Sequence, residues 1–186
     1  MTNENKILHN WEILQRVTVY KGRVFDVEEK KARSPRTGKI LNVHAIRCAD
    51  WVMVLPLTQE NEVVMVRQYR HGMESIFLEL PGGIVDAKDP SPETAARREL
   101  LEETGYDAAT FIEMGETFPQ PAILDNKGIF YLARGVRRVR TEKWDAGEDM
   151  EIVRVPLSAI EDLIEKKEIR HGMVLLAFFF FQRIQR

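Results

Sequence analysis

The chain has 186 residues, 44% of them hydrophobic, and a formal net charge of −2. This predicts one main domain with a sizeable core, and the near balance of charges argues against a nucleic-acid partner. The most apolar run, Met173–Phe181, is too short to cross roughly 30 Å of hydrocarbon, so no membrane partner is expected. A single Cys48 and an N-terminus without an apolar signal core favour a cytoplasmic protein.

Short apolar segments separated by turn signals follow the polar first ten residues. Turns are indicated at Lys21-Gly22 and Pro35–Gly38, and strands are predicted over residues 11–14, 17–20, 24–27 and 41–48. Antiparallel strands with so little bulk need another surface to pack on. We therefore expect residues 1–49 to form a β extension that packs on the main domain or on a second subunit, as in a homodimer.

Residues 50–186 are predicted to form the main domain. Val63–Val66 is continuously apolar, as in a strand covered on both faces. The segments 51–57, 62–70, 76–80, 111–118, 127–133 and 152–156 are expected to be strands. With helices interspersed, this order predicts an α+β fold, an α/β/α sandwich in which helices flank a mixed sheet.

Three helices are predicted in the main domain. Ser91 and Pro92 suit the N-cap and first position of a helix over residues 92–104, and Gly105 suits its C-terminal end. Ser158 and Glu161 form a capping-box pattern that opens a helix reaching about residue 167. The last helix is expected over residues 172–185, with its phenylalanines packed into the core.

Three carboxylates gather near the end of the first of these helices. Glu99, Glu102 and Glu103 are spaced i, i+3 and i+4, which places them on one helix face. Their mutual repulsion and the helix dipole both disfavour this arrangement. A bound cation would offset both effects, although a Glu-rich helix end is more commonly a solvated face.

The stretch from Gly83 to Tyr106 resembles the Nudix box, G-x5-E-x7-R-E-U-x-E-E-x-G-U, in which U is a bulky apolar residue. Arg98–Tyr106 (R-E-L-L-E-E-T-G-Y) matches the second half at every position. The first half departs, because Pro90 stands where the family has its first glutamate and the loop is one residue longer. Asp89 is the expected substitute for that glutamate, which in the family braces the box through the arginine.

Other features resemble the ADP-ribose and nucleotide-sugar pyrophosphatase branch of the Nudix hydrolases. Glu79–Gly83 (E-L-P-G-G) is similar to its loop and Val66–Arg70 (V-R-Q-Y-R) to one of its strands, and Pro121 lies sixteen residues beyond Gly105. Residues 20–25 are similar to its dimer-forming extension. The resemblance covers nearly the whole chain and implies a Nudix fold with N-terminal antiparallel strands.

The resemblance implies Mg²⁺-dependent hydrolysis, with Mn²⁺ as an alternative ion, of the diphosphate bond of ADP-ribose or a nucleoside-diphosphate sugar. The products would be a nucleoside monophosphate and a sugar phosphate. The implied metal ligands are Glu99, Glu102, Glu103, Glu148 and the backbone carbonyl of Gly82. Glu102 and Glu103 are also candidate catalytic groups, together with Glu148 and Asp145 of an acidic loop that could supply the general base.

Four further residues are candidate substrate contacts. Arg67 could bind the diphosphate as a fork of N–H donors, and Glu79 could accept hydrogen bonds from sugar hydroxyls. Phe25 could stack on the base from across a dimer, and Pro121 lies in the loop expected to select the substrate. The alternatives are a surface ion pair for Arg67 and a core or interface position for Phe25.

Two other functions stay open at this stage. The altered first half of the box is compatible with a Nudix-like module that binds a nucleotide sugar without hydrolysing it, although the complete glutamate set argues for an enzyme. The substrate could also be another diphosphate derivative, such as a dinucleoside polyphosphate. A test for turnover in the presence of Mg²⁺ distinguishes these possibilities.

Overall fold

The computed structural model describes residues 8–144, 147 and 149–185. The chain divides into two compact units. The first unit contains the residues up to Cys48 together with 120–126, and the second contains residues 49–119 and those from Lys127 onward. The segment 120–126, which the sequence placed with the main domain, therefore belongs to the N-terminal unit.

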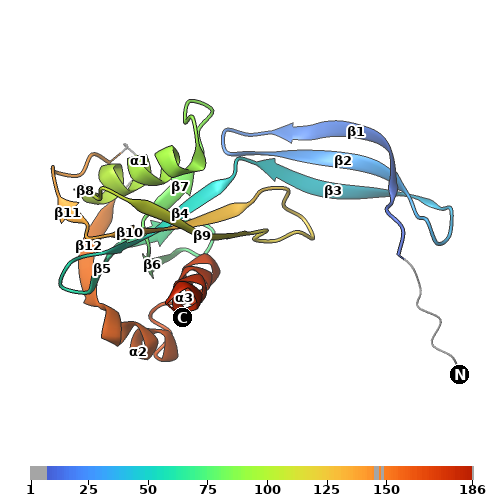
Figure 1. The fold of residues 1–186 in the computed structure, drawn as a ribbon. Coiled ribbons are helices and arrows are strands. Elements are labelled where there is room, and N and C mark those ends of the chain that lie inside the picture. Colours follow the sequence, from blue (N-terminus) through green and yellow to red (C-terminus); the bar gives the residue numbers. More distant parts are fainter. Residues whose placement is uncertain (1–7, 145–146, 148, 186) are drawn as a thin grey trace, which may run out of the picture. The chain divides into compact units, whose positions relative to one another are not determined.

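The first unit is a three-stranded antiparallel sheet in the order β1-β2-β3 (Figure 1). Its strands are β1 (Glu12–Lys21), β2 (Phe25–Arg33) and β3 (Ile40–Cys48). β1 is one continuous strand, where the sequence predicted two short ones, and it shows register shifts at Ile13/Gln15 and Thr18/Tyr20. Backbone pairing between Ile46 and residues 123–125 attaches the second segment to β3.

The second unit is built on a mixed sheet. The strand order is β12-β5-β4-β10-β9, with β6 paired to β5 and β7 paired to β4. β4 and β10 are parallel, whereas the other pairs are antiparallel. The strands are β4 (Trp51–Leu57), β5 (Glu62–Arg70), β6 (Ser75–Glu79), β7 (Gly82–Ile84), β9 (Phe111–Thr117), β10 (Gly128–Arg134) and β12 (Met150–Pro156), and a separate short pair joins β8 (Tyr106–Asp107) to β11 (Arg137–Arg138).

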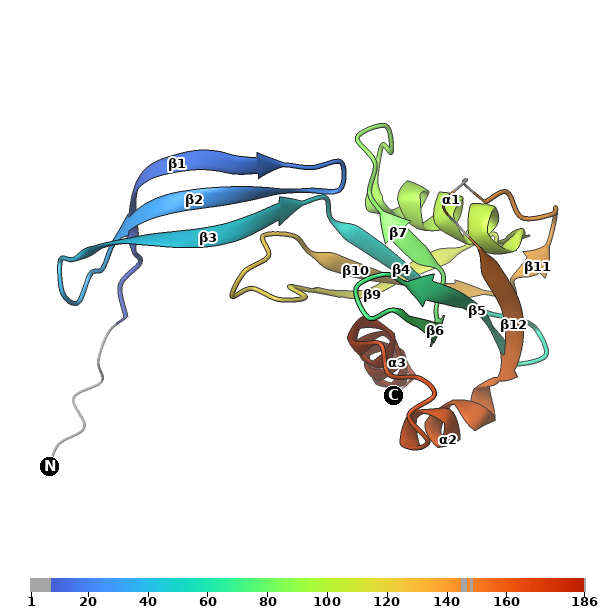
Figure 2. The same cartoon turned by 180° about the vertical axis from the view of Figure 1, so that it is seen from behind.

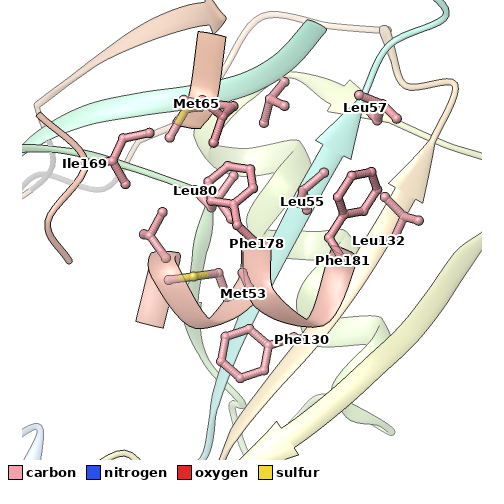
Figure 3. Packing of buried hydrophobic residues seen from close by; sticks show 14 of the residues in the cluster. Met53, Leu55, Leu57, Met65, Leu80, Phe130, Leu132, Ile169, Phe178 and Phe181 are labelled. Atoms are coloured by element: carbon pink, nitrogen blue, oxygen red, sulfur yellow. The ribbon is translucent and has the colours of Figure 1, made fainter. Parts of the chain in front are cut away.

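Helices cover both faces of this sheet, which confirms the predicted α/β/α sandwich (Figures 1 and 2). Side chains alternate along β4, so Val52 and Val54 pack with α1 (Pro92–Thr104), whereas Met53 and Leu55 pack with α3 (Gly172–Ile184). Figure 3 shows the core on the α3 side, where Phe178 lies beside Leu80 and Phe181 lies near Leu132. Phe179, by contrast, is exposed.

The helix ends show where local sequence signals were sufficient. The range of α1 is the predicted one, because Ser91 Oγ accepts the Thr94 N–H (3.2 Å) and Gly105 adopts the left-handed conformation (φ 72°). The predicted capping box at Ser158 is wrong. A 3₁₀ turn, η1 (Leu157–Ala159), precedes α2 (Ile160–Glu165), and α2 begins without a side-chain cap.

β4 and β5 meet at Leu57 and Val63 and then diverge. β6 continues the sheet from β5, β7 continues it from β4, and Pro81 O accepts the Val54 N–H (2.9 Å) between them. Residues 80–83, called the Gly82-Gly83 loop below, lead into β7, which lies beside α1 (Figure 2). None of the described helices is both long and apolar enough to span a membrane.

Candidate active site

Two glycines let the β6–β7 loop approach the carboxylates of α1 directly. The Gly82 N–H donates to Glu103 Oε2 (3.0 Å). A Cβ on Gly83 would lie 2.4 Å from Glu99 Oε1, and one on Gly82 would lie 2.2 Å from Val52 O, so a larger residue would push the loop away at either position. Glycine is therefore required at both positions, at Gly82 because the backbone passes close to β4 and at Gly83 because it passes close to the Glu99 carboxylate.

The three predicted carboxylates all belong to α1 but differ in their surroundings. Glu99 and Glu103 are buried, whereas the Glu102 side chain is 40% exposed. One guanidinium nitrogen, Arg98 Nη1, donates to both Glu99 Oε1 (2.8 Å) and Glu102 Oε2 (3.2 Å). Burying carboxylates without such partners would be strongly unfavourable, so Arg98 compensates part of their charge.

Asp89 takes the bracing position that the sequence predicted for it. Arg98 Nε and Nη2 donate to the two Asp89 oxygens (3.2 and 2.8 Å), and Nη2 also donates to Ile84 O. Hydrogen bonding to Arg98 holds the pKa of Asp89 below its ordinary value, and the same bond raises the pKa of Arg98. The longer loop thus restores a carboxylate–arginine brace with a shorter side chain.

The segment before the acidic loop covers the C-terminal end of α1. The Lys143 N–H donates to Glu102 O (2.8 Å), and Trp144 Nε1 donates to Glu103 O (2.9 Å). These bonds satisfy carbonyls that a helix end leaves without partners, and they anchor this segment to the backbone of Glu102 and Glu103. Spacing alone did not reveal this role of Trp144. Asp145 and Glu148, the predicted loop residues, lie outside the described residues.

Glu79 is fully buried and belongs to a bidentate ion pair. Arg70 Nε and Nη2 donate to its two oxygens at 3.0 and 2.6 Å. Burial opposes the charge of Arg70, but its bonds to Glu79 and the charges of Glu79 and Glu103 outweigh burial and raise its pKa. Arg70 is partly exposed and covers the buried Glu79 carboxylate. The sequence did not single out Arg70 as a site residue.

The other predicted substrate contacts are Arg67, Phe25 and Pro121. Arg67 Nη1 pairs with Glu151 Oε2 (2.8 Å) on the neighbouring strand β12, which is the surface ion pair considered as its alternative. Phe25 and Pro121 belong to the N-terminal unit, where both are exposed and Phe25 packs against Tyr20. Their predicted contacts with substrate stay predictions.

A cavity of about 340 Å³ borders the Gly82-Gly83 loop. This volume lies within the roughly 300–1,000 Å³ typical of small-molecule sites. Its walls come from the paired strands β4 and β7, from Arg70 and from the start of α3, and they comprise Trp51, Val52, Met53, Arg70, Gly82, Gly83, Ile84, His171 and Met173. The sequence did not predict that His171 would reach this region.

The oxygen-rich composition of the site fits a hard divalent cation. Within the described ranges, no three carboxylate, imidazole or thiol side chains are already arranged around a single point, and Arg98 occupies the space between Glu99 and Glu102. Carboxylate oxygens are nevertheless the ligands that Mg²⁺ prefers. The close approach of Gly83 to Glu99 leaves no side chain between the loop and these oxygens.

Comparisons with known proteins agree with this geometry. A family model described as "NUDIX domain" matches residues 49–178, and the chain belongs to this family. It is 30% identical to an ADP-ribose pyrophosphatase of Bacillus subtilis over 88% of each chain, and 29% identical to a GDP-mannose pyrophosphatase of Escherichia coli over 67% of this chain and 69% of the relative. A crystal structure of an "ADP compounds hydrolase" matches with a TM-score of 0.85 and 26% identity, covering 96% of this chain and 95% of the other. The predicted family and fold are confirmed.

Replacement of Asp89 by asparagine tests the brace. We expect Asp89→Asn to lower the free energy of unfolding by about 1–2 kcal/mol at pH 7, because it removes a charge-assisted bond from Arg98. The pKa of Asp89 is lowered in the folded state, so its contribution is complete above the ordinary value of 3.8 and is lost as the pH falls through the folded value. Urea unfolding of both proteins between pH 7 and pH 3 measures the difference.

Asp107→Asn is the matched control, because Asp107 pairs with the adjacent Arg97 on α1 and both side chains are about one third exposed. Such a surface pair is expected to contribute less than about 1 kcal/mol. Equal unfolding free energies for Asp89→Asn and the wild type at pH 7 would show that Asp89 does not brace the loop.

Proposed function

We propose that the chain is a Mg²⁺-dependent pyrophosphohydrolase that cleaves the diphosphate bond of ADP-ribose or a nucleoside-diphosphate sugar. The main support for this proposal is the direct approach of the Gly82-Gly83 loop to the buried carboxylates of Glu99 and Glu103 within a NUDIX domain. The pyrophosphatase names of the relatives support the reaction class. A non-hydrolysing module would have no need for this costly group of buried carboxylates.

In the proposed reaction, a water oxygen forms a bond to one phosphorus and the bridging P–O bond breaks. The products are a nucleoside monophosphate and a sugar phosphate. Mg²⁺ held by Glu99, Glu102, Glu103 and the Gly82 carbonyl would neutralise diphosphate charge and lower the pKa of the attacking water. Arg98 maintains the separation of Glu99 and Glu102, and the Gly82 N–H orients Glu103.

The proton of the attacking water needs a base within hydrogen-bond reach. We assign this role to the acidic loop that carries Asp145 and Glu148, with Glu148 as a further metal ligand. The anchoring of Lys143 and Trp144 supports the assignment, because both are bonded to the backbone of residues whose side chains are proposed metal ligands, Glu102 and Glu103. Arg67 is proposed to contact the diphosphate, and Glu79 is proposed to act through Arg70 because both of its oxygens are engaged.

The N-terminal unit is proposed to form a homodimer, with Phe25 and Pro121 contributing to substrate binding. Apolar side chains are unusually exposed on and around its small sheet: Trp11, Ile13, Leu14, Val17, Val19, Tyr20, Val24, Phe25, Ile40, Leu41 and Val43. Such a concentration of exposed apolar groups is typical of a protein interface. A single cysteine, Cys48, agrees with the proposed cytoplasmic location.

A substrate panel tests the proposed reaction. Purified protein is incubated with ADP-ribose, several nucleoside-diphosphate sugars and a dinucleoside polyphosphate, and nucleoside monophosphate release is measured by chromatography. We expect turnover of ADP-ribose or a nucleotide sugar with Mg²⁺, loss of turnover with EDTA and recovery with added Mg²⁺ or Mn²⁺. Binding without turnover of any member would instead support the non-hydrolysing module.

Glu103→Gln tests the carboxylate at the centre of the site. Glutamine keeps an oxygen that can accept the Gly82 N–H but removes the charge, so we expect at least about a hundredfold loss of kcat with an unchanged circular dichroism spectrum. Glu93→Gln, at an exposed position in the first turn of the same helix, is the control and should retain full activity. Near wild-type turnover of Glu103→Gln would refute the assignment.

Val17→Glu tests the proposed interface. Val17 is 44% exposed on β1, and a charge buried between two subunits would be strongly unfavourable, so the variant should sediment as a monomer while the wild type sediments as a dimer. Val139→Glu introduces the same charge at an exposed valine of the second unit and should leave the mass unchanged. A monomeric wild-type protein at micromolar concentration would contradict the dimer.

A further inference from the structure

A further cavity of the second unit, of about 550 Å³, is lined by arginines. Three of its lining residues are cations, Arg97 of α1, Arg134 at the end of β10 and Arg137 of β11, and one is an anion, Asp107 of β8. Three cations and one anion leave an excess of two positive charges. Neither the α1 carboxylates nor the glycines of the Gly82-Gly83 loop line this cavity, so it is separate from the candidate active site.

Arg97 is held in one orientation by three contacts. Its Nη1 donates to Asp107 Oδ1 and to Ala108 O, and its guanidinium lies over the Phe111 ring, 4.5 Å from the centroid. A guanidinium has five N–H groups, and these two bonds use only those of Nη1. The described residues accept no hydrogen bond from Nε or Nη2, so these nitrogens can donate to a ligand.

The turn after β10 places the other two arginines on the wall of the same cavity. Gly135 adopts the left-handed conformation (φ 66°), and the N–H groups of Gly135 and Val136 both donate to Leu57 O (2.7 and 3.1 Å). This turn lies between Arg134 and Arg137, whose side chains are both exposed. Neither arginine forms an ion pair within the part of the chain that the structure describes.

The charge of these arginines favours an anion in the cavity. The strand register places Arg137 opposite Asp107, but the Asp107 carboxylate is bonded to Arg97 instead. A cleft lined by charges of one sign concentrates ions of the opposite sign, and the planar guanidinium donates paired N–H groups to phosphate oxygens. A phosphate monoester carries about two negative charges at neutral pH, which matches the excess of two positive charges.

We propose that this cavity binds a phosphate dianion, either free or as the phosphate group of a small monoester. Arg97 would be the fixed contact, and Arg134 and Arg137 would supply the uncompensated charge. The volume lies within the roughly 300–1,000 Å³ typical of small-molecule sites, and Ala109 and Val139 add apolar surface beside the arginines. The inference goes beyond the proposed hydrolysis and does not depend on it, because no proposed metal ligand contributes to this cavity.

Heteronuclear NMR on the isotope-labelled full chain tests the proposal. The protein is titrated in EDTA with inorganic phosphate, AMP and ribose 5-phosphate, and with adenosine as an uncharged control. Without divalent ions the α1 carboxylates repel phosphate, so binding reports on the arginines. We expect saturable shifts of the Arg97 Nε–H and of the Ala109 and Gly135 amides, with dissociation constants of about 1 mM, and none with adenosine.

The variants Arg134→Gln and Arg137→Gln should each weaken phosphate binding about tenfold, because each removes a charge-assisted contact. Arg137→Lys, which keeps the charge but loses the planar fork, should recover part of the affinity. Arg140→Gln is the matched control, since Arg140 is an exposed arginine of the same segment that does not line the cavity. It removes the same charge and should bind phosphate like the wild type.

The two possible sources of the phosphate group are distinguished in the same titrations. Equal affinities for inorganic phosphate and for the monoesters would identify the free ion as sufficient, whereas tighter binding of a monoester would show that its organic part also occupies the cavity. Absence of saturable shifts with every phosphate compound would overturn the proposal, as would equal weakening by Arg140→Gln and Arg137→Gln. Either of these two results leaves the proposed hydrolysis intact, because that reaction is assigned to the α1 carboxylates.

Discussion

The site depends on one steric constraint, the absence of side chains where the β6–β7 loop meets α1. A Cβ on Gly83 would overlap the Glu99 carboxylate, and one on Gly82 would overlap the backbone of β4. The loop therefore fits tightly between sheet and helix, with the Gly82 N–H on Glu103. The divergence of β4 and β5 and the capping of α1 both help to position the loop and the helix against each other.

Charge is the second constraint, because Glu99 and Glu103 are buried at the helix end that least favours anions. Arg98 compensates by bonding Glu99, Glu102 and Asp89 at once, so one cation joins the carboxylates to the loop. Arg70 has a similar relation to Glu79 on the other side of the loop. Two arginines thus hold buried carboxylates in place on either side of the proposed diphosphate position.

The same divergence of β4 and β5 that delivers the loop also creates space for a ligand. The cavity beside the loop is mostly apolar, and Arg70 and His171 are among its lining residues. The α1 carboxylates and this cavity therefore share one backbone segment as a wall. In the proposed reaction, this wall would connect substrate binding with the site of hydrolysis through a few peptide units, which favours precise placement of the scissile bond.

The sequence by itself determined the family, through its resemblance to the Nudix box, together with the α/β/α fold and the limits of α1, which follow from the order of the elements and from local caps. It also predicted Asp89 as the brace, since the box motif counts residues from Arg98. Only the tertiary structure decided that Glu79 is sealed by Arg70, that Trp144 caps the helix and that His171, rather than His71, enters the cavity. Those contacts join residues distant in sequence, and identical local sequences at 70–73 and 170–173 acquire different environments only when the sheet and helices pack.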